Sequence, residues 1–392
     1  MFHSKTNSSA ARRVQRAEVR PRRQKKHIFI AAFSGLAILV GVLFILDGAP
    51  VPADNKPNEK VQAEQNQVPA VSSRLKPDAV KAIYVTMHTA GRREAFSKLI
   101  DLADATEINA MVIDVKGSQG ELLFDYLDAP ALVKTLRERN IYTIARVVVF
   151  QDSGLAKTNP DAVIKNKNGG IWRDRSGFAW ADPASREAWD NVVNVSKRAL
   201  DAGFDEINYD YIRFPTDGNL ENMVYPVWDG QKPRGEVIKN FSVYARGELK
   251  KYAPDAAISI DIFGYTFLRS DGLGIGQQLS DLLDEFDYVY PMVYPSHYSA
   301  GNFGFQNPAE HPYEVIKGTI EKGLEQLGGK AELAKPKIRP WLQVFDLGAE
   351  YTPEMIKKEI NATYDSLDEK STGWLLWDPS NRYDQAIEYL TR

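Results

Sequence analysis

The sequence predicts an α/β fold, a (β/α)8 TIM barrel preceded by one transmembrane helix and a flexible linker. Three observations lead to this prediction. Short strand-like runs alternate with longer amphipathic stretches over about 310 residues, and eight strands in such an alternation are typical of a closed barrel. Residues 27–46 form an uninterrupted, mostly apolar run, and residues 47–80 are rich in Pro, Asn, Gln, Ala and Val without any period.

The first 46 residues predict a membrane anchor. Residues 1–26 contain nine Lys or Arg and one Glu, a net charge of +8, whereas residues 27–46 contain no Asp, Glu, Lys or Arg. Twenty helical residues span the ~30 Å hydrocarbon core of a bilayer. The positive-inside rule places the basic tail in the cytoplasm and the rest outside a bacterial inner membrane, in the periplasm or beyond. A cleaved signal peptide is the alternative, although its apolar region is only about 7–15 residues long.

Residues 47–80 are predicted to be a flexible linker, and residues 81–392 the barrel domain. In chain order, eight runs rich in β-branched and aromatic residues predict its strands: Ala82–Thr86, Ala110–Lys116, Tyr142–Phe150, Glu206–Pro215, Ile258–Thr266, Tyr288–Pro295, Ile338–Phe345 and Gly373–Pro379.

The stretches between these runs have helical periodicity, and the clearest predict the following helices: Arg92–Thr106, Ala129–Asn140, Ser185–Ala202, Gly235–Tyr252, Tyr313–Leu327 and Thr352–Leu367. The pairs Asp182-Pro183 and Thr352-Pro353 are typical of a helix N-cap followed by Pro at the first helical position. A doubly wound open sheet is the rival fold. Residues 85–89, after the first strand, read Val-Thr-Met-His-Thr and contain no glycine-rich phosphate loop, which disfavours a nucleotide-binding version.

The composition excludes several kinds of site. No cysteine is present, so disulfides, zinc–cysteine sites and thiol nucleophiles are excluded. The whole chain carries a net charge of −3, and with +8 in residues 1–26 the remainder carries −11. An acidic domain lacks the basic face that nucleic acid requires, so we expect no nucleic-acid partner. The sequence also indicates no cofactor.

Four aspartates interrupt four apolar strands near their predicted C-terminal ends, where a barrel carries its active site: Asp114, Asp210, Asp261 and Asp378. A carboxylate buried in a strand is unfavourable unless it is paired or used. Asn208 lies two residues before Asp210, so both side chains face the same side of the strand.

Two carboxylates on adjacent strands are what glycoside hydrolysis requires, because one protonates the leaving oxygen and the other attacks carbon or activates water. Asp210 and Asp261 are the predicted catalytic pair. Asp114, Asp378 and Asn208 are predicted to bind substrate or organise the site. Arg213 either holds Asp210 ionised or contacts a substrate carboxylate, with a structural salt bridge as the alternative.

Aromatic residues near the same ends predict sugar contacts, because aromatic rings stack on the apolar faces of sugars. Trp172 and Trp180 lie in the long loop after the third strand, Tyr294 and His297 follow the sixth, and Trp377 ends the eighth. Barrel packing is the alternative role for any one of these rings, and a lone loop histidine often has no function.

Four segments carry a resemblance to a known family: 204–215 (Phe-Asp-Glu-Ile-Asn-Tyr-Asp-Tyr-Ile-Arg-Phe-Pro), 258–264, 290–298 and 373–383. Over roughly Ala82 to Tyr389 the chain resembles a bacterial glycosyl hydrolase domain family, first described as a domain of unknown function and linked to alpha-amylase-like TIM-barrel glycosidases. The resemblance implies a barrel with Asp210 as the nucleophile. Amylase-like barrels carry Arg where this chain has Asn208, and usually a Glu acid after strand five, where it offers Asp261.

We therefore expect a membrane-anchored glycosidase that cleaves an envelope or extracellular polysaccharide. One alternative is a glycan-binding barrel without catalysis. Another is a metal-dependent polysaccharide deacetylase that uses several Asp with His88 or His297. The sequence contains no His-x-His or His-x-x-x-His spacing, so we predict no metal site.

Overall fold

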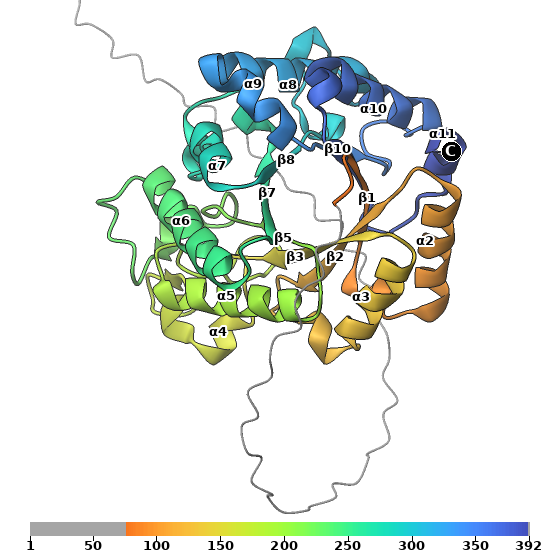
Figure 1. Cartoon of the computed structure of the whole chain (residues 1–392). Helices are drawn as coiled ribbons and strands as arrows, with labels where there is room; N and C mark the ends of the chain where they lie inside the picture. Colours follow the sequence, from red (N-terminus) through yellow and green to blue (C-terminus); the bar gives the residue numbers. More distant parts are fainter. Residues whose placement is uncertain (1–75, 391–392) are drawn as a thin grey trace, which may run out of the picture. The chain divides into compact units, whose positions relative to one another are not determined.

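A computed structural model of the chain describes residues 76–390 (Figure 1). The predicted basic tail, the transmembrane segment and nearly all of the linker lie outside these residues. Between residues 76 and 390, no helix has both the length and the apolar composition needed to cross a bilayer.

Eight parallel strands close into a barrel, which confirms the predicted fold class. Their order around the barrel follows the chain, and the last strand pairs with the first. The strands are β1 (Val80–Val85), β2 (Ala110–Lys116), β3 (Tyr142–Val148), β5 (Glu206–Asp210), β7 (Ala257–Phe263), β8 (Tyr288–Met292), β9 (Trp341–Gln343) and β10 (Gly373–Trp377).

Each of the eight strands coincides with a predicted one, but several end earlier. Strand β5 stops at Asp210, whereas the sequence predicts a strand to Pro215. The next residue, Tyr211, has φ +56°, a left-handed conformation that a continuing strand cannot contain. Asp210 is therefore the last residue of the strand.

Helices surround the ring of strands (Figure 1). They are α1 (Met87–Ala90), α2 (Arg93–Ala105), α3 (Ala129–Glu138), α4 (Leu155–Thr158), α5 (Arg186–Asp201), α6 (Arg234–Tyr252), α7 (Leu279–Glu285), α8 (Pro312–Leu327), α9 (Ala331–Ala334), α10 (Pro353–Leu367) and α11 (Ile387–Leu390). All six predicted helices are present.

The two predicted caps have different outcomes. Thr352 caps α10 as expected, because its side chain accepts a hydrogen bond from the Met355 N–H. The cap predicted at Asp182 is wrong, because α5 begins later and Ser185 caps it. Buried Asp182 instead accepts hydrogen bonds from the backbone N–H groups of Val227 (2.7 Å) and Trp228 (2.9 Å), and so fastens the loop after β5.

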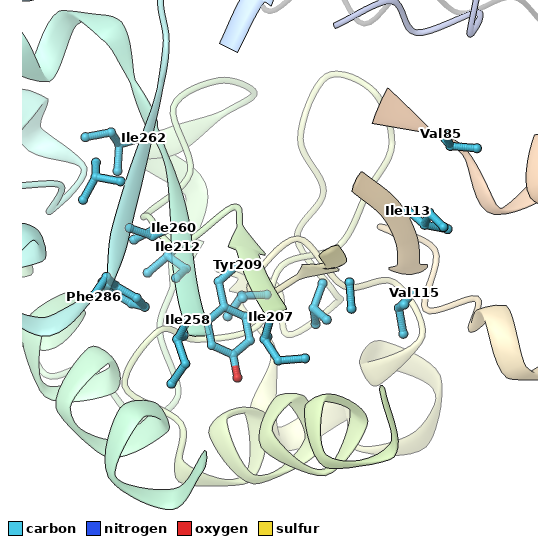
Figure 2. Close-up of a cluster of buried hydrophobic side chains, with 14 of the residues drawn as sticks. Val85, Ile113, Val115, Ile207, Tyr209, Ile212, Ile258, Ile260, Ile262 and Phe286 are labelled. Carbon is cyan, nitrogen blue, oxygen red and sulfur yellow. The ribbon is translucent and has the colours of Figure 1, made fainter. Parts of the chain in front are cut away.

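The alternation of side chains along the strands separates two environments. Ile207, Tyr209 and Ile258 lie between the strands and the helices (Figure 2), and Tyr209 reaches Ser196 of α5 with an O–O distance of 2.8 Å. The intervening residues therefore face the barrel interior. In β5 and β7 these are Glu206, Asn208, Asp210, Ser259 and Asp261.

Two short strands join the loops above β3 and β5. Strand β4 (Lys165–Asn166) and strand β6 (Met223–Val224) pair antiparallel. These loops follow the C-terminal ends of their barrel strands, whereas the described chain enters the barrel at Val80, at the N-terminal end of β1. The sheet of β4 and β6 is therefore at the C-terminal end of the barrel, whereas the described chain enters at the N-terminal end.

Candidate active site

An arginine binds three aspartates at the C-terminal end of the barrel. Arg146 of β3 donates from Nη1 to Asp114 Oδ1 of β2 (2.6 Å) and from Nη2 to Asp210 Oδ2 of β5. Its Nε lies 3.7 Å from Asp261 Oδ2 of β7. These four side chains are between 1% and 12% exposed, so the ion pairs are largely shielded from water.

Strand register explains how these side chains meet. Asp114 pairs with Arg146 across β2 and β3, and Arg146 pairs with Asn208 across β3 and β5. Asp210 lies one inward-facing position above Asn208, and parallel strands bring such positions together at one end of a barrel. The sequence thus places one cation among three anions.

Asp261 has the most enclosed carboxyl group of the three. Its Oδ1 accepts hydrogen bonds from Asn208 Nδ2 (3.0 Å) and from the Trp341 indole N–H (2.8 Å). Burial, followed by the nearby charge of Asp210, raises the pKa of Asp261 well above its usual range. This carboxyl group therefore favours its protonated form.

Two aromatic rings line the other side of the cluster. Tyr84 of β1 donates from its hydroxyl to Asp114 Oδ2, and its ring stacks on Trp377 of β10 with centroids 3.9 Å apart. The Arg146 guanidinium lies 5.6 Å from the centre of the Tyr84 ring and 5.4 Å from that of Trp377. Cation–π contact adds to the ion pairs that hold Arg146 in place.

The structure brings Asn208 into contact with the predicted catalytic pair, but in a supporting position. Its side chain is fully buried and donates to Asp261 and to Ser259 Oγ (3.2 Å). Arg213 lies beyond the end of β5 and donates to the Phe214 carbonyl and to Thr216, each at 3.3 Å. The cation that binds Asp210 is thus Arg146, which the sequence analysis did not single out.

Trp172 and Trp180 have packing contacts in the loop after β3. Trp172 is 1% exposed and donates to the Asn219 carbonyl (2.9 Å), and Trp180 is 2% exposed and donates to Asp174 (2.8 Å). The Arg213 guanidinium lies 4.9 Å from the Trp180 ring centre. Trp180 is therefore fixed within its own loop and Trp172 by the loop after β5, and their role as sugar contacts stays a prediction.

Tyr294 and His297 lie at the same end of the barrel, after β8. Their rings are 5.2 Å apart, and Tyr294 is 6.4 Å from Trp377. Burial lowers the pKa of His297, which favours the neutral imidazole. Asp378 follows β10, and burial raises its pKa while its Oδ1 accepts the Ser380 N–H (2.5 Å).

The sequence contained a signal for Arg146 that the analysis did not use. Residues 142–150 read Tyr-Thr-Ile-Ala-Arg-Val-Val-Val-Phe, so a single charge interrupts an apolar strand. The same reasoning that selected the strand-end aspartates applies to a strand-end arginine, because a buried charge needs a partner.

Metal ligands do not gather in the described part of the chain. Among residues 76–390, no group of three or more His, Asp or Glu side chains is arranged to hold a metal ion. His88 packs edge-on against Tyr126, and Nδ1 of His297 lies 3.1 Å from Ser296 Oγ. The described residues therefore supply no donor set for the deacetylase alternative.

A closed barrel with acidic side chains at the carboxyl ends of its strands is the architecture on which TIM-barrel glycosidases are built. The sequence matches the family described as "Putative glycosyl hydrolase domain" over residues 82–383. The chain belongs to this family, which confirms the predicted resemblance. Among curated proteins none matches the chain.

A solved structure of low sequence identity shows the same fold. The GH36 alpha-galactosidase AgaB from Geobacillus stearothermophilus is 12% identical, covers 80% of this chain and 40% of its own, and gives a TM-score of 0.50. This chain therefore spans about two fifths of that enzyme. A hypothetical protein from Ruminiclostridium thermocellum is 33% identical, with 46% of this chain and 96% of its own covered and a TM-score of 0.41.

Proposed function

We propose that the protein hydrolyses a glycosidic bond in an envelope or extracellular polysaccharide, with Asp210 as nucleophile and Asp261 as its partner acid. One observation carries the proposal: the two carboxyl groups come from neighbouring strands at the carboxyl end of the barrel and face the same guanidinium. A nucleophile and an acid must flank one glycosidic bond, and this arrangement supports that geometry.

The roles follow from the environments of the two acids. Asp210 is bound by Arg146 and accepts a backbone hydrogen bond from the Tyr211 N–H (2.6 Å), both of which stabilise its ionised form. Asp261, with its raised pKa, has the proton that a leaving oxygen needs. A carboxylate nucleophile forms a glycosyl intermediate, so we expect retention of the anomeric configuration.

A sugar substrate also needs groups that position it. Trp377 is partly exposed beside the acids and offers a ring face, and Asp114 and Asp378 offer hydroxyl-binding carboxylates at the same end of the barrel. Tyr294 packs between Trp377 and Phe345, with centroid distances of 6.4 and 5.7 Å.

The membrane anchor is part of the proposal and rests on sequence composition. We infer that residues 27–46 hold the protein in a bacterial inner membrane with the basic tail in the cytoplasm and the barrel on the other side. Membrane fractionation tests this: the full chain should stay with the membrane after alkaline carbonate washing, and a variant lacking residues 27–46 should not. Recovery of both proteins in the soluble fraction would overturn the anchor.

The catalytic proposal is tested by Asp210→Asn in the full chain, assayed for new reducing ends on a panel of envelope polysaccharides. We expect at least a 1000-fold loss (an order-of-magnitude figure for a nucleophile), while the urea unfolding midpoint stays close to that of the unmodified protein. Asp229→Asn, at an exposed loop residue, is the matched control and should keep full activity. An Asp210→Asn protein with full activity would refute the assignment.

A glycan-binding barrel without catalysis is the second candidate, and one observation favours it: the Asp261 side chain is only 1% exposed. The same panel separates the two functions. A protein that binds a polysaccharide but releases no reducing ends is a binding barrel, and Asp210→Asn would then leave hydrolysis at the same background level.

A further inference from the structure

We propose that Arg146 is a positioning residue that holds Asp210 ionised and leaves Asp261 as the acid that carries the proton, an inference that rests on the proposed glycosidase function. The starting point is charge. The Arg146 guanidinium contacts three carboxyl groups, and the buried guanidinium of Arg213 interacts with Asp210 at longer range, so full ionisation would leave an excess negative charge in a site that is almost closed to water. Such a site favours neutralisation of one carboxyl group.

The contacts of Arg146 are unequal. Its two terminal nitrogens donate to Asp114 and Asp210, whereas Nε is 3.7 Å from Asp261 and donates no hydrogen bond within the described residues. Charge-assisted hydrogen bonds stabilise a carboxylate about twice as strongly as neutral ones. The guanidinium therefore stabilises the carboxylates of Asp114 and Asp210 most, and that of Asp261 least.

Further donors reinforce this difference. Tyr84 donates to Asp114, and the Tyr211 N–H donates to Asp210. The donors to Asp261 are the neutral side chains of Asn208 and Trp341, and both bind Oδ1. The Oδ2 atom, which faces Arg146, is thus the oxygen on which a proton would reside.

The cluster includes titratable groups from every neighbouring element. Tyr84 of β1, Asp114 of β2, Asp210 of β5 and Asp261 of β7 surround Arg146, and Tyr294 after β8 is close enough to interact electrostatically with the acids. Tyr211 and Arg213, which follow β5, also interact electrostatically with Asp210. Burial raises the pKa of Tyr84 and Tyr294 well above its usual range, so these phenols remain neutral. A proton that this cluster releases or binds near neutral pH therefore belongs to one of the three carboxyl groups.

The assignment gives a balanced first step. An Asp210 oxygen forms a bond to the anomeric carbon as the bond from that carbon to the leaving oxygen breaks. The electron pair of the broken bond stays on the leaving oxygen, which takes the proton from Asp261. Water then cleaves the glycosyl–Asp210 ester and returns a proton to Asp261, which restores the initial state.

The protonation pattern can be measured without any substrate. The full chain, labelled with ¹³C at the aspartate carboxyl carbons, is titrated by NMR, and Asp210→Asn and Asp261→Asn assign the two resonances. At about pH 6, where an ordinary Asp is ionised, we expect the Asp261 signal of a neutral carboxyl and the Asp210 signal of a carboxylate. An ionised Asp261, or a protonated Asp210, at that pH overturns the proposal.

Activity profiles test the role of Arg146 itself. In Arg146→Gln we expect kcat to fall at least about 100-fold with a smaller change in KM, and the acidic limb of the pH–rate profile to move upward. Arg146→Lys, which keeps the charge, should move that limb less. An equal loss at every pH, with the limb in place, would show a merely structural role and overturn the proposal.

The two proposals fail in different ways. An unmodified protein that releases no reducing ends refutes hydrolysis, while the NMR titration of the same protein still decides whether Asp261 is the protonated acid. A protein that hydrolyses through Asp210 but has an ionised Asp261 at about pH 6 refutes only the role of Arg146. If Arg146→Gln does not fold, Arg146→Lys and the titration of the unmodified protein still decide.

Discussion

Arg339 and Glu206 form a fully buried ion pair inside the barrel, with 3.4 Å between Nη1 and Oε2. Both side chains are 0% exposed, and Tyr142 and Tyr290 also donate to the glutamate. Glu206 begins β5 whereas Asp210 ends it, so this pair lies toward the opposite end of the barrel from the acids. Charges there can stabilise the fold without taking part in the reaction.

We predict that Arg339→Met lowers the free energy of unfolding by about 3–5 kcal/mol, because it leaves the Glu206 charge buried and unpaired. Urea denaturation monitored by tryptophan fluorescence measures the loss. Lys134→Met, which breaks an exposed pair with Glu138, is the control and should change stability by less than about 0.5 kcal/mol. Equal effects of the two substitutions would contradict the prediction.

A second buried acid should make stability depend on pH. Glu359 of α10 is fully buried, accepts hydrogen bonds from the Gln343 N–H (2.8 Å) and the Tyr351 hydroxyl, and burial raises its pKa well above the usual range. Above about pH 4.3 the unfolded chain loses this proton while the folded chain keeps it. This contribution to stability therefore falls by ~1.4 kcal/mol per pH unit until the pH passes the raised pKa.

Glu359→Gln removes that dependence, so its stability relative to the unmodified protein should rise between pH 5 and pH 7 by an amount on the order of 1–3 kcal/mol. Urea denaturation at several pH values measures the difference. Glu369→Gln, at an exposed residue beyond α10, is the matched control and should show a constant offset. A constant offset for Glu359→Gln as well would show that Glu359 is ionised in the fold.

The substitution Asp261→Asn tests whether Asp261 is the acid that protonates the leaving oxygen. Because the pKa of Asp261 is raised, its protonated form persists above the usual range, and activity should decline as pH rises through that pKa. Asp261→Asn should lose this alkaline limb and at least about 100-fold activity on the polysaccharide, yet retain most of kcat/KM on an aryl glycoside, because kcat/KM reports the first step and this leaving group needs no proton. Equal losses on both substrates would contradict the acid role.

Trp377→Ala should weaken substrate binding. We expect KM to rise roughly 10-fold, equivalent to about 1.4 kcal/mol, with a smaller change in kcat, because a stacking face is lost while the acids remain. Initial-rate kinetics on the polysaccharide measure both constants. Tyr252→Ala, at a 40% exposed aromatic residue that ends α6, is the control. A purely kcat effect would instead indicate that Trp377 acts by supporting Tyr84.

Sequence reasoning identified the barrel because its signals are local. Period-two strands and capped amphipathic helices such as Pro353–Leu367 can be recognised one segment at a time. Strand ends were less predictable, because the left-handed φ of Tyr211 ends β5 in a run that still looks apolar and aromatic. The Asp182 cap failed for a related reason, since a loop 45 residues later takes up its carboxylate.

Which side chains meet in the site depends on contacts between distant segments. Asp210 and Asp261 could be placed at the rim because each interrupts a strand of known direction. Their shared partner could not be chosen, because Arg146 and Arg213 both follow the pattern of a charge near a strand end, and only the register of β3 against β5 separates them. Likewise, a polar loop containing Trp172 does not reveal that the indole is enclosed.

The described chain enters β1 at Val80, and the acids lie at the other end of the strands. A strand of seven residues is about 23 Å long. The barrel therefore separates the end at which the chain enters from the end that carries the acids. If the proposed anchor is correct, the chain that comes from the membrane reaches the barrel at the end opposite the acids. Such an enzyme would trim polymer at a distance from the membrane and spare glycans at the bilayer surface.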